Sequence, residues 1–162
     1  MHFALNGPTV KSKENIEAFR TALTKRGGPA DPKAEFSGGC AIGVSRQIVV
    51  ADTEEEEARA IDAPATQHLY ENLTYLLRVH TNSDFVKRLN IPGSPDFDQN
   101  VKMGTLIAGT PETLVAQIRE QVATLLINYL IYLLFLGCMT LLQALRSLQL
   151  FKTEVMPKIA DL

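Results

Sequence analysis

Few side chains in this sequence have the types and spacing that catalysis or metal binding requires. The histidines His2, His68 and His80 are far apart and form no His-Glu-x-x-His pattern, so no metal site is predicted. The acidic run at 54–57 could attract a cation, but consecutive carboxylates at a helix start usually complement the helix dipole. No Ser-His-Asp order, P-loop or dinucleotide-binding glycine pattern occurs. These patterns alone therefore assign no catalytic residue.

Two single residues remain as candidates for chemistry. Asp52 could contact a substrate or cofactor, although a solvated carboxylate beside a helix N-terminus is the commoner case and is expected here. Cys138 could be a reactive thiol, but its apolar neighbours favour an inert packing role. Cys40 lies in a glycine-rich turn, so neither a disulfide framework nor a Cys-x-x-Cys metal pair is predicted. A reducing cytoplasm is the expected compartment.

The composition indicates a single domain with one core. The 162 residues are 46% hydrophobic and 21% charged, and the formal net charge is −2. This charge gives no long-range attraction to nucleic acid or to anionic membranes. The segment 1–6 lacks the basic and long apolar regions of a secretory signal, which again favours the cytoplasm.

The first half of the chain reads as alternating strands and helices. A short strand at 3–5 should stop at the turn Asn6-Gly7-Pro8, and a helix with Ser12 as its N-cap should run to Lys25. The Val- and Ile-rich segment 41–51 predicts a largely buried strand. Residues 53–56 form a capping box that should begin a helix, which breaks or bends at Pro64 and continues to Val79.

The second half continues this alternation. Residues 81–104 are expected to form a loop or short-helix excursion, after which Thr110 should cap a helix that has Pro111 at its first position. A buried strand at 127–136, a turn at 137–138 and a closing helix at 140–155 should follow, with the inward residues Leu141, Leu145, Leu148, Phe151 and Val155.

The apolar run from Val122 to Leu145 leaves an alternative open. Its 24 positions contain no charged residue, which is long enough to span a bilayer. Its leucine content also suits a helix better than a strand. The amphipathic patterns on both sides favour a water-soluble layered protein, so a membrane anchor is the less favoured interpretation.

Several segments occur in an order that resembles a known family. They are Ala41 to Thr53, Gly109 to Leu114, Asn128-Tyr129 and Gln143 to Pro157. Together they resemble the C-terminal part of the bacterial luciferase-like, flavin-dependent monooxygenases, which fold as TIM barrels. A complete barrel needs roughly 250 residues. The resemblance therefore implies an α/β fold with a partial (β/α) TIM barrel of about three to four βα units, and residues 1–162 would form one domain, with 81–104 as a loop excursion.

The resemblance also implies a function and a region for the site. Members of this family use FMN to insert one oxygen atom from O2 into a small organic substrate. Barrel active sites lie at the C-terminal ends of the strands, which here selects Asn6, Gly7, Asp52, Thr53, Gly137 and Cys138. Most strands that cradle the flavin would lie in a preceding half that this chain lacks, so the flavin pocket is incomplete and catalytic residues stay unassigned. A second copy or another chain would complete the barrel. The alternatives are a non-catalytic half-barrel assembly module and a small membrane-anchored protein spanning with 122–145.

Overall fold

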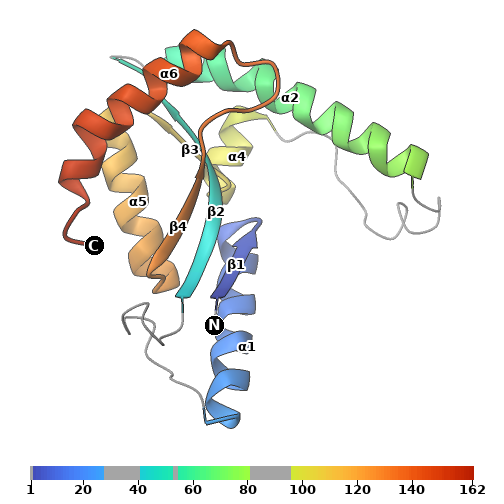
Figure 1. Cartoon of the computed structure of the whole chain (residues 1–162), viewed down its shortest axis with the longest axis vertical. Helices are drawn as coiled ribbons and strands as arrows, with labels where there is room; N and C mark the ends of the chain where they lie inside the picture. The colour runs from blue at the N-terminus through green and yellow to red at the C-terminus, as the bar shows by residue number, and fades with distance from the viewer. Residues whose placement is uncertain (1, 28–40, 53–54, 81–95) are drawn as a thin grey trace.

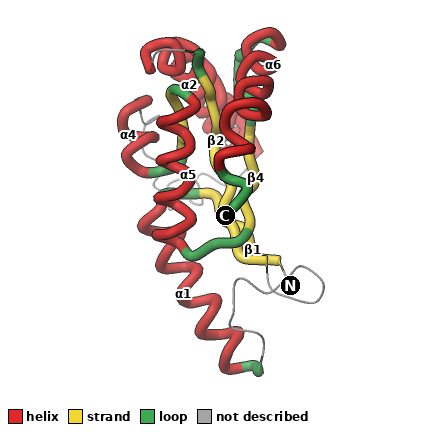
Figure 2. The backbone as a smooth tube through the Cα atoms, turned by 90° about the vertical axis from the view of Figure 1, so that its left-hand side faces the viewer, coloured by secondary structure: helices red, strands yellow, loops and turns green. Residues whose placement is uncertain are grey.

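Helices cover both faces of a parallel sheet in this protein (Figure 1, Figure 2). The structure is a computed structural model, and it describes residues 2–27, 41–52, 55–80 and 96–162. The elements of the first half are β1 (His2–Asn6), α1 (Thr9–Lys25), β2 (Ala41–Val50) and α2 (Glu55–His80). Those of the second half are α4 (Phe97–Met103), β3 (Leu106–Gly109), α5 (Pro111–Leu125), β4 (Tyr129–Leu133), α6 (Leu141–Leu150), the π-helical turn η1 (Phe151–Val155) and the 3-10 turn η2 (Met156–Lys158).

Strand β2 is the centre of the four-stranded sheet, and every other strand pairs with it in parallel. Gly43 pairs with both β1 and β4, so these two strands lie on opposite edges of β2. Gln47 pairs with both β3 and β4, which places β3 on the same edge as β1 but nearer the C-terminal end. The strand order therefore reverses after β2.

This reversal explains why helices lie on both faces. Right-handed crossovers that run in opposite directions across a sheet place their helices on opposite sides. The even-numbered β2 residues Ile42 and Ile48 pack against α1, α5 and the C-terminal helical segment, whereas Val49 packs against α2 and α4. The prediction of an α/β fold is confirmed. In a (β/α) barrel the strands follow one another in sequential order and all helices lie on the outside. The described sheet has a reversed strand order and helices on both faces, so the partial barrel stays a prediction.

The predictions for β2, α1 and α5 agree with the structure. Strand β2 is largely buried, as its Val and Ile content predicted. Thr110 caps α5 by accepting from the Thr113 N–H, with Pro111 in the first helical position. The buried residues of α1 include Ile16 and Leu23. Short-range signals are sufficient for these elements because each has strong apolar periodicity or turn chemistry at its ends.

The N-terminal boundary predicted for α1 is wrong. The helix begins at Thr9, and Ser12 lies inside it with only 2% of its surface exposed. The Ser12 hydroxyl donates to the Gly7 carbonyl oxygen at 3.2 Å. A serine inside a first turn can satisfy its hydroxyl on a nearby backbone carbonyl, so the residue type alone did not identify the cap.

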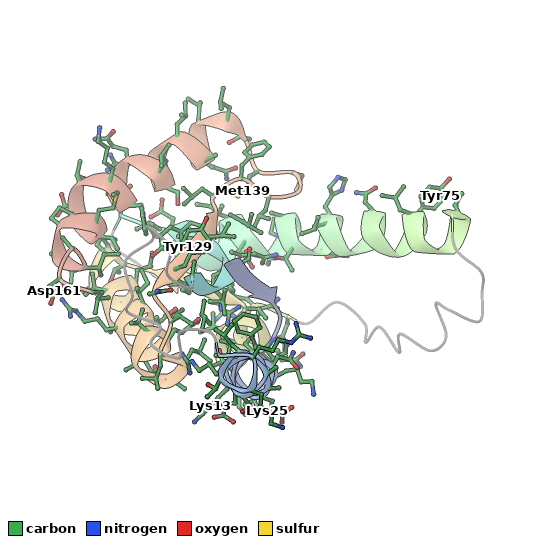
Figure 3. All side chains as sticks on the ribbon, turned by 60° about the horizontal axis from the view of Figure 1, so that its bottom comes forward. Lys13, Lys25, Tyr75, Tyr129, Met139 and Asp161 are labelled. Carbon is green, nitrogen blue, oxygen red and sulfur yellow. The ribbon has the colours of Figure 1, made fainter. Side chains whose placement is uncertain are left out.

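Helix α2 continues through Pro64, so of the predicted break or bend the break does not occur, and the helix continues past Val79 to His80. The far half of α2 stands clear of the other elements and carries Tyr75, which is 64% exposed (Figure 3). Leu76 and Val79 on this half are also exposed, rather than facing a core as their spacing suggested. Glu54 and Thr53 of the predicted capping box lie outside the described residues. So does most of the predicted 81–104 excursion, whose last part forms α4.

The uncharged run from Val122 to Leu145 divides into a helix end, a strand, a turn and a helix start. Among the described residues, no helix combines the length and the apolarity that crossing a bilayer requires. Strand β4 is shorter than predicted and only partly buried, with Tyr129 and Leu133 both more than a third exposed. Within the described part of the chain, β4 pairs with β2 along one edge, which leaves its two end residues the most exposed.

Helix α6 presents a different face from the one predicted. Leu141, Leu145 and Leu148 are exposed, and the inward residues are Ala144 and Ser147. The Val50 N–H donates to the Ser147 hydroxyl at 2.9 Å, so α6 satisfies a backbone group on the edge of β2 beyond the end of β4. Small residues permit this close approach. The predictions of a buried Phe151 and a buried Val155 are confirmed.

Candidate functional site

The strands of the sheet end at different heights, which separates Asn6 and Gly7 from Asp52 among the six predicted barrel-mouth residues. Asn6 pairs with Ser45, in the middle of β2, so Asn6 and Gly7 lie well below the C-terminal end of that strand. Asp52 lies two residues beyond the end of β2. Thr53 lies outside the described residues. The structure therefore does not bring this set together at one edge.

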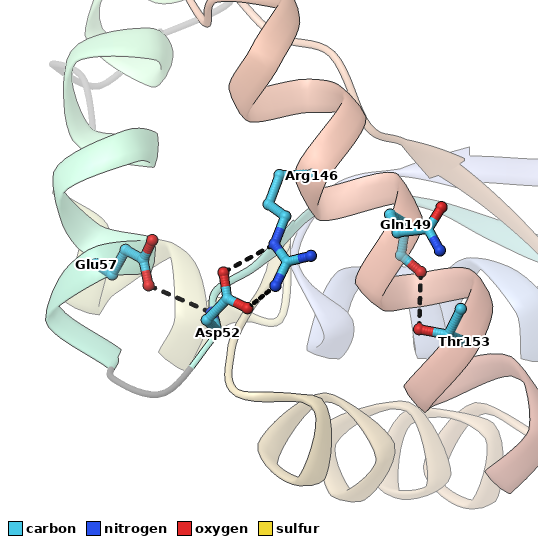
Figure 4. Close-up of polar contacts among 5 residues, drawn as sticks. All are labelled: Asp52, Glu57, Arg146, Gln149 and Thr153. Carbon is cyan, nitrogen blue, oxygen red and sulfur yellow. Dashed lines mark hydrogen bonds and ion pairs between the residues drawn. The ribbon is translucent and has the colours of Figure 1, made fainter.

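Asp52 joins α6 to the end of β2 (Figure 4). Its carboxylate accepts from the Nε of Arg146 at 2.9 Å and also from the Nη2, and its backbone N–H donates to Glu57 at 3.2 Å. The hydrogen bonds from the Arg146 guanidinium hold the pKa of Asp52 below its usual value. Both oxygens accept from Arg146, and Asp52 is exposed, so the carboxylate stays at the solvated surface beside the start of α2 and forms an ion pair with α6.

Gly137 and Cys138 form the predicted turn after β4. A Cβ at Gly137 would lie 2.1 Å from the Ala65 carbonyl oxygen, and its φ is +51°, so only glycine permits this contact with α2. Cys138 is exposed, which overturns the inert packing role predicted for it. Neither residue adjoins a described cavity.

The largest described cavity lies between α2 and α4, where sequence reasoning identified no site. It has a volume of about 480 Å³, within the range of small-molecule sites. Its described lining is Asp62, Ala63, Thr66, Gln67, Glu71, Asp96 and Phe97. We take this α2–α4 pocket as the candidate functional site.

Asp62 is the group in this pocket with the most altered chemistry. It is 1% exposed, and its burial raises its pKa to about 6, against a smaller opposing effect of the Thr66 hydroxyl. That hydroxyl lies 3.2 Å from each carboxylate oxygen and 3.5 Å from Gln47 Oε1. A carboxyl group that titrates near neutral pH can serve as a general acid or base.

The wall formed by α4 is fixed to α2 by a charged and aromatic contact. Arg59 makes two hydrogen bonds of 2.8 Å to Asp98, and its guanidinium lies 4.4 Å from the centre of the Phe97 ring. Asp96 caps α4 by accepting from the Gln99 N–H at 2.8 Å. These contacts hold Phe97 and Asp96 in the pocket lining.

Within the described ranges, no three His, Cys, Asp or Glu side chains gather as metal ligands. The signal in the sequence that points to Asp62 is its spacing from Thr66 on one turn of helix, on the same side as the buried Ala58 and Ala65.

Comparisons with known proteins give structural matches alone. No family model matches the chain, and no match was found among curated proteins. Monooxygenase RslO1 from Streptomyces bottropensis matches with a TM-score of 0.63 and 18% identity over 96% of this chain and 40% of its own. The oxygenating constituent of 3,6-diketocamphane monooxygenase from Pseudomonas putida, solved with FMN, matches with a TM-score of 0.60 and 18% identity over 98% of this chain and 42% of its own.

A riboflavin lyase (RcaE), solved with modified FMN and riboflavin, gives a TM-score of 0.57 and 18% identity over 99% of this chain and 38% of its own. These identities are low, so the matches establish similarity of fold. The chain thus resembles a part of these proteins in fold and spans about 40% of their length.

Proposed function

We propose that this chain is the C-terminal part of a luciferase-like, FMN-dependent monooxygenase, an oxidoreductase that inserts one oxygen atom from O2 into a small organic substrate. The observation that carries the proposal is that 96% and 98% of the chain align with two monooxygenases of known structure. The sequence segments that resemble the luciferase-like family support the same assignment.

The described residues of the α2–α4 pocket do not fit FMN. The lining carries the carboxylates Asp62, Glu71 and Asp96, and no basic side chain is among its described residues. A phosphate dianion placed there would meet like charge without a cationic partner. The flavin would therefore bind elsewhere, in a site that this chain forms only in part.

We infer that a second copy of the chain completes that site. Strand β4 pairs along one edge only within the described sheet, and its odd-numbered face is partly exposed. Large apolar side chains are also exposed, namely Leu141, Leu142, Leu145 and Leu148 on α6, Tyr75, Leu76 and Val79 on α2, and Phe135 after β4. The four leucines of α6 lie on one short helix, and exposed apolar surfaces of this kind can mark interaction sites.

In the assembled protein, Asp62 would be the acid or base that this chain supplies. The Thr66 hydroxyl donates to its carboxyl group, and Phe97 gives the pocket an apolar wall. Its pKa of about 6 allows either protonation state near neutral pH. The substrate would be a small organic molecule that contacts this pocket.

The test is an absorbance titration of the purified chain with FMN over a range of protein concentrations, with the oligomeric state measured in parallel. We expect saturable binding with a shifted flavin spectrum, appearing only where the oligomer forms. A folded chain that leaves the FMN spectrum unchanged at every concentration, whether or not it oligomerises, would refute the proposal.

A second candidate is a non-catalytic half-barrel that serves as an assembly module. The exposed leucines of α6 favour it, because they indicate association without requiring any cofactor. It predicts a stable oligomer that binds no flavin, so the same titration separates the two functions.

A further inference from the structure

Side chains block the edges of the sheet at three places. The Gln117 amide accepts from the Ala108 N–H at 3.3 Å and donates to the Ala108 carbonyl oxygen at 3.1 Å, on the edge of β3 away from β2. Along the opposite edge of β2, the Ile42 N–H donates to Asn128 Oδ1 at 2.9 Å before β4 begins. Beyond the end of β4, the Ser147 hydroxyl accepts from the same edge. Free backbone groups on a strand edge can pair with another chain, and these contacts occupy them.

The outer edge of β4 differs from these places. Strand β4 lies on the side of β2 away from β1 (Figure 1), and β2 is its one strand partner among the described residues. The Asn128 N–H donates to the Ile42 carbonyl oxygen at 3.1 Å, so the even-numbered backbone groups point to β2 and those of Ile131 and Leu133 point outward. No side chain in the described part of the chain bonds to these outward groups of Ile131 and Leu133. They can therefore pair with another strand.

The sequence of β4 also lacks the features that usually protect an edge strand. Its five residues, Tyr-Leu-Ile-Tyr-Leu, include no charged residue, proline or glycine. The uncharged run around it extends from Val122 to Leu145. Edge strands of monomeric proteins commonly carry a lysine, a proline or a bulge that prevents pairing with another chain. Two copies of this strand can consequently meet without bringing like charges together, which is the charge pattern that self-association requires.

Helix α6 extends the same apolar surface beyond the end of β4. Ser147 faces the edge of β2, because its hydroxyl accepts from the backbone there. Leu142 and Leu145 lie opposite Ser147 on the helix, and the exposed Leu141 and Leu148 lie beside them. These leucines therefore point away from the sheet on the side of the outer edge of β4. We call the outer edge of β4 and the four leucines the β4–α6 surface.

We propose that a second copy of the chain binds at the β4–α6 surface, with the two β4 strands paired antiparallel about a two-fold axis at Ile131. A two-fold axis perpendicular to the sheet makes the two edge strands antiparallel. Ile131 of one copy then lies opposite Ile131 of the other, and the two residues exchange both backbone hydrogen bonds. Helix α6 of each copy comes beside the start of β4 in the other copy, where Leu126 is exposed. The result is one continuous sheet across the dimer.

A second copy fits this surface better than an unrelated peptide because the surface complements itself. The two-fold axis brings an uncharged strand against an identical uncharged strand, and it brings the α6 leucines of each copy toward the exposed Leu126 of the other. Apolar pairs across two strands and buried leucines both stabilise such a contact. The pairing rests on the association of two copies in the proposed function, but it requires no flavin.

The experiment is analytical ultracentrifugation of the purified full chain and of the variants Ile131→Lys and Ile131→Glu, without flavin. We expect the wild type to dimerise. Each variant should dimerise at least about tenfold more weakly, because like charges would lie directly opposite each other across the axis. An equimolar mixture of the two variants should recover the dimer, since lysine then faces glutamate. This recovery is specific to a contact in which residue 131 faces itself.

Val10→Lys and Val10→Glu are the matched controls, because Val10 is an exposed apolar residue on α1, and they should dimerise as the wild type does. A wild type that stays monomeric, variants with wild-type affinity, or a mixture that associates no better than its components would each overturn the proposal. Hydrogen exchange in the wild type gives a test without substitution, since the Ile131 amide should become protected only in the dimer. Equal exchange in monomer and dimer would refute the pairing. No sample contains flavin, so the FMN titration is judged separately.

Discussion

Replacing Asp62 by asparagine should stabilise the protein at neutral and alkaline pH. The carboxyl group is 1% exposed, and burial raises its pKa from 3.8 to about 6. The folded state therefore binds this proton more tightly than the unfolded state does. Asparagine resembles the protonated carboxyl in shape and charge, and its amide oxygen can still accept from the Thr66 hydroxyl, which lies 3.2 Å from the aspartate oxygens.

The magnitude follows from the difference between the two pKa values. A shift of about two pH units corresponds to about 3 kcal/mol, at 1.36 kcal/mol per unit. Because the folded pKa is the higher one, the contribution of Asp62 is most favourable below about pH 4 and decreases as the pH rises to about 6. Above about pH 6 the stability of the wild type is lowered by the full free-energy cost of keeping the Asp62 carboxylate ionised in a buried site. The Asp62→Asn variant should then be more stable by up to about 3 kcal/mol, and nearly equal at about pH 4.

The assay is urea denaturation of both proteins, followed by far-ultraviolet circular dichroism because the chain has no tryptophan. The quantity to compare is the difference in free energy of unfolding at each pH, in which the contributions of all other ionisable groups cancel. Glu71→Gln is the matched control, since it removes the same charge from an exposed site on the same helix and pocket. A difference between wild type and Asp62→Asn that stays constant from about pH 4 to about pH 8 would show that Asp62 is not held in a desolvated site.

Three further substitutions test the packing of the sheet and of α6. Gly43→Ala should lower the unfolding midpoint and cost about 1–3 kcal/mol, because its Cβ would lie 2.2 Å from the Tyr129 carbonyl oxygen; an unchanged midpoint would contradict the close approach of β4. Ser147→Ala should cost about 1–3 kcal/mol in urea denaturation, since it leaves the buried Val50 N–H without its acceptor, and a change below about 0.5 kcal/mol would argue against that contact. Leu142→Gln should reduce self-association in sedimentation without altering the unfolding of the monomer, because Leu142 is 79% exposed on α6. An unchanged oligomer would place the interface elsewhere.

Elements with strong local signals were predictable from the sequence. The Val- and Ile-rich strand β2 and the Thr110-Pro111 start of α5 depend on residues that are adjacent in the chain. Their formation requires little information from the rest of the fold. Strand β3, only four residues long, was not distinguished by its own pattern and is defined by its pairing with β2.

The orientation of α6 could not be obtained in the same way. Its leucines recur at helical spacing and would ordinarily face a core. The structure instead turns Ala144 and Ser147 inward. The last residue of β2, Val50, lies beyond the stretch that pairs with β4, and its backbone N–H finds its acceptor in the Ser147 hydroxyl. A backbone group that lies 97 residues away in sequence thus decides the face of the helix. The cost is an exposed leucine face, which is the surface that the proposed assembly would cover.

The burial of Asp62 and that of Arg46 both follow from the reversal of strand order at β2, which no local pattern encodes. Because β3 returns to the edge occupied by β1, α2 lies on the face opposite α1 and α5, and Asp62 is buried near Gln47. The same return leaves Arg46 between the end of β1 and the start of β3. In the sequence, Arg46 is a single charged position in an otherwise apolar strand, and Asp62 is a charged position in an amphipathic helix. Sequence patterns alone would place both side chains in solvent. Whether a charged side chain is buried depends on the neighbours that the topology brings to it. Here one topological feature buries both Asp62, whose pKa is raised, and Arg46, whose described hydrogen-bond partners are an amide and a carbonyl oxygen.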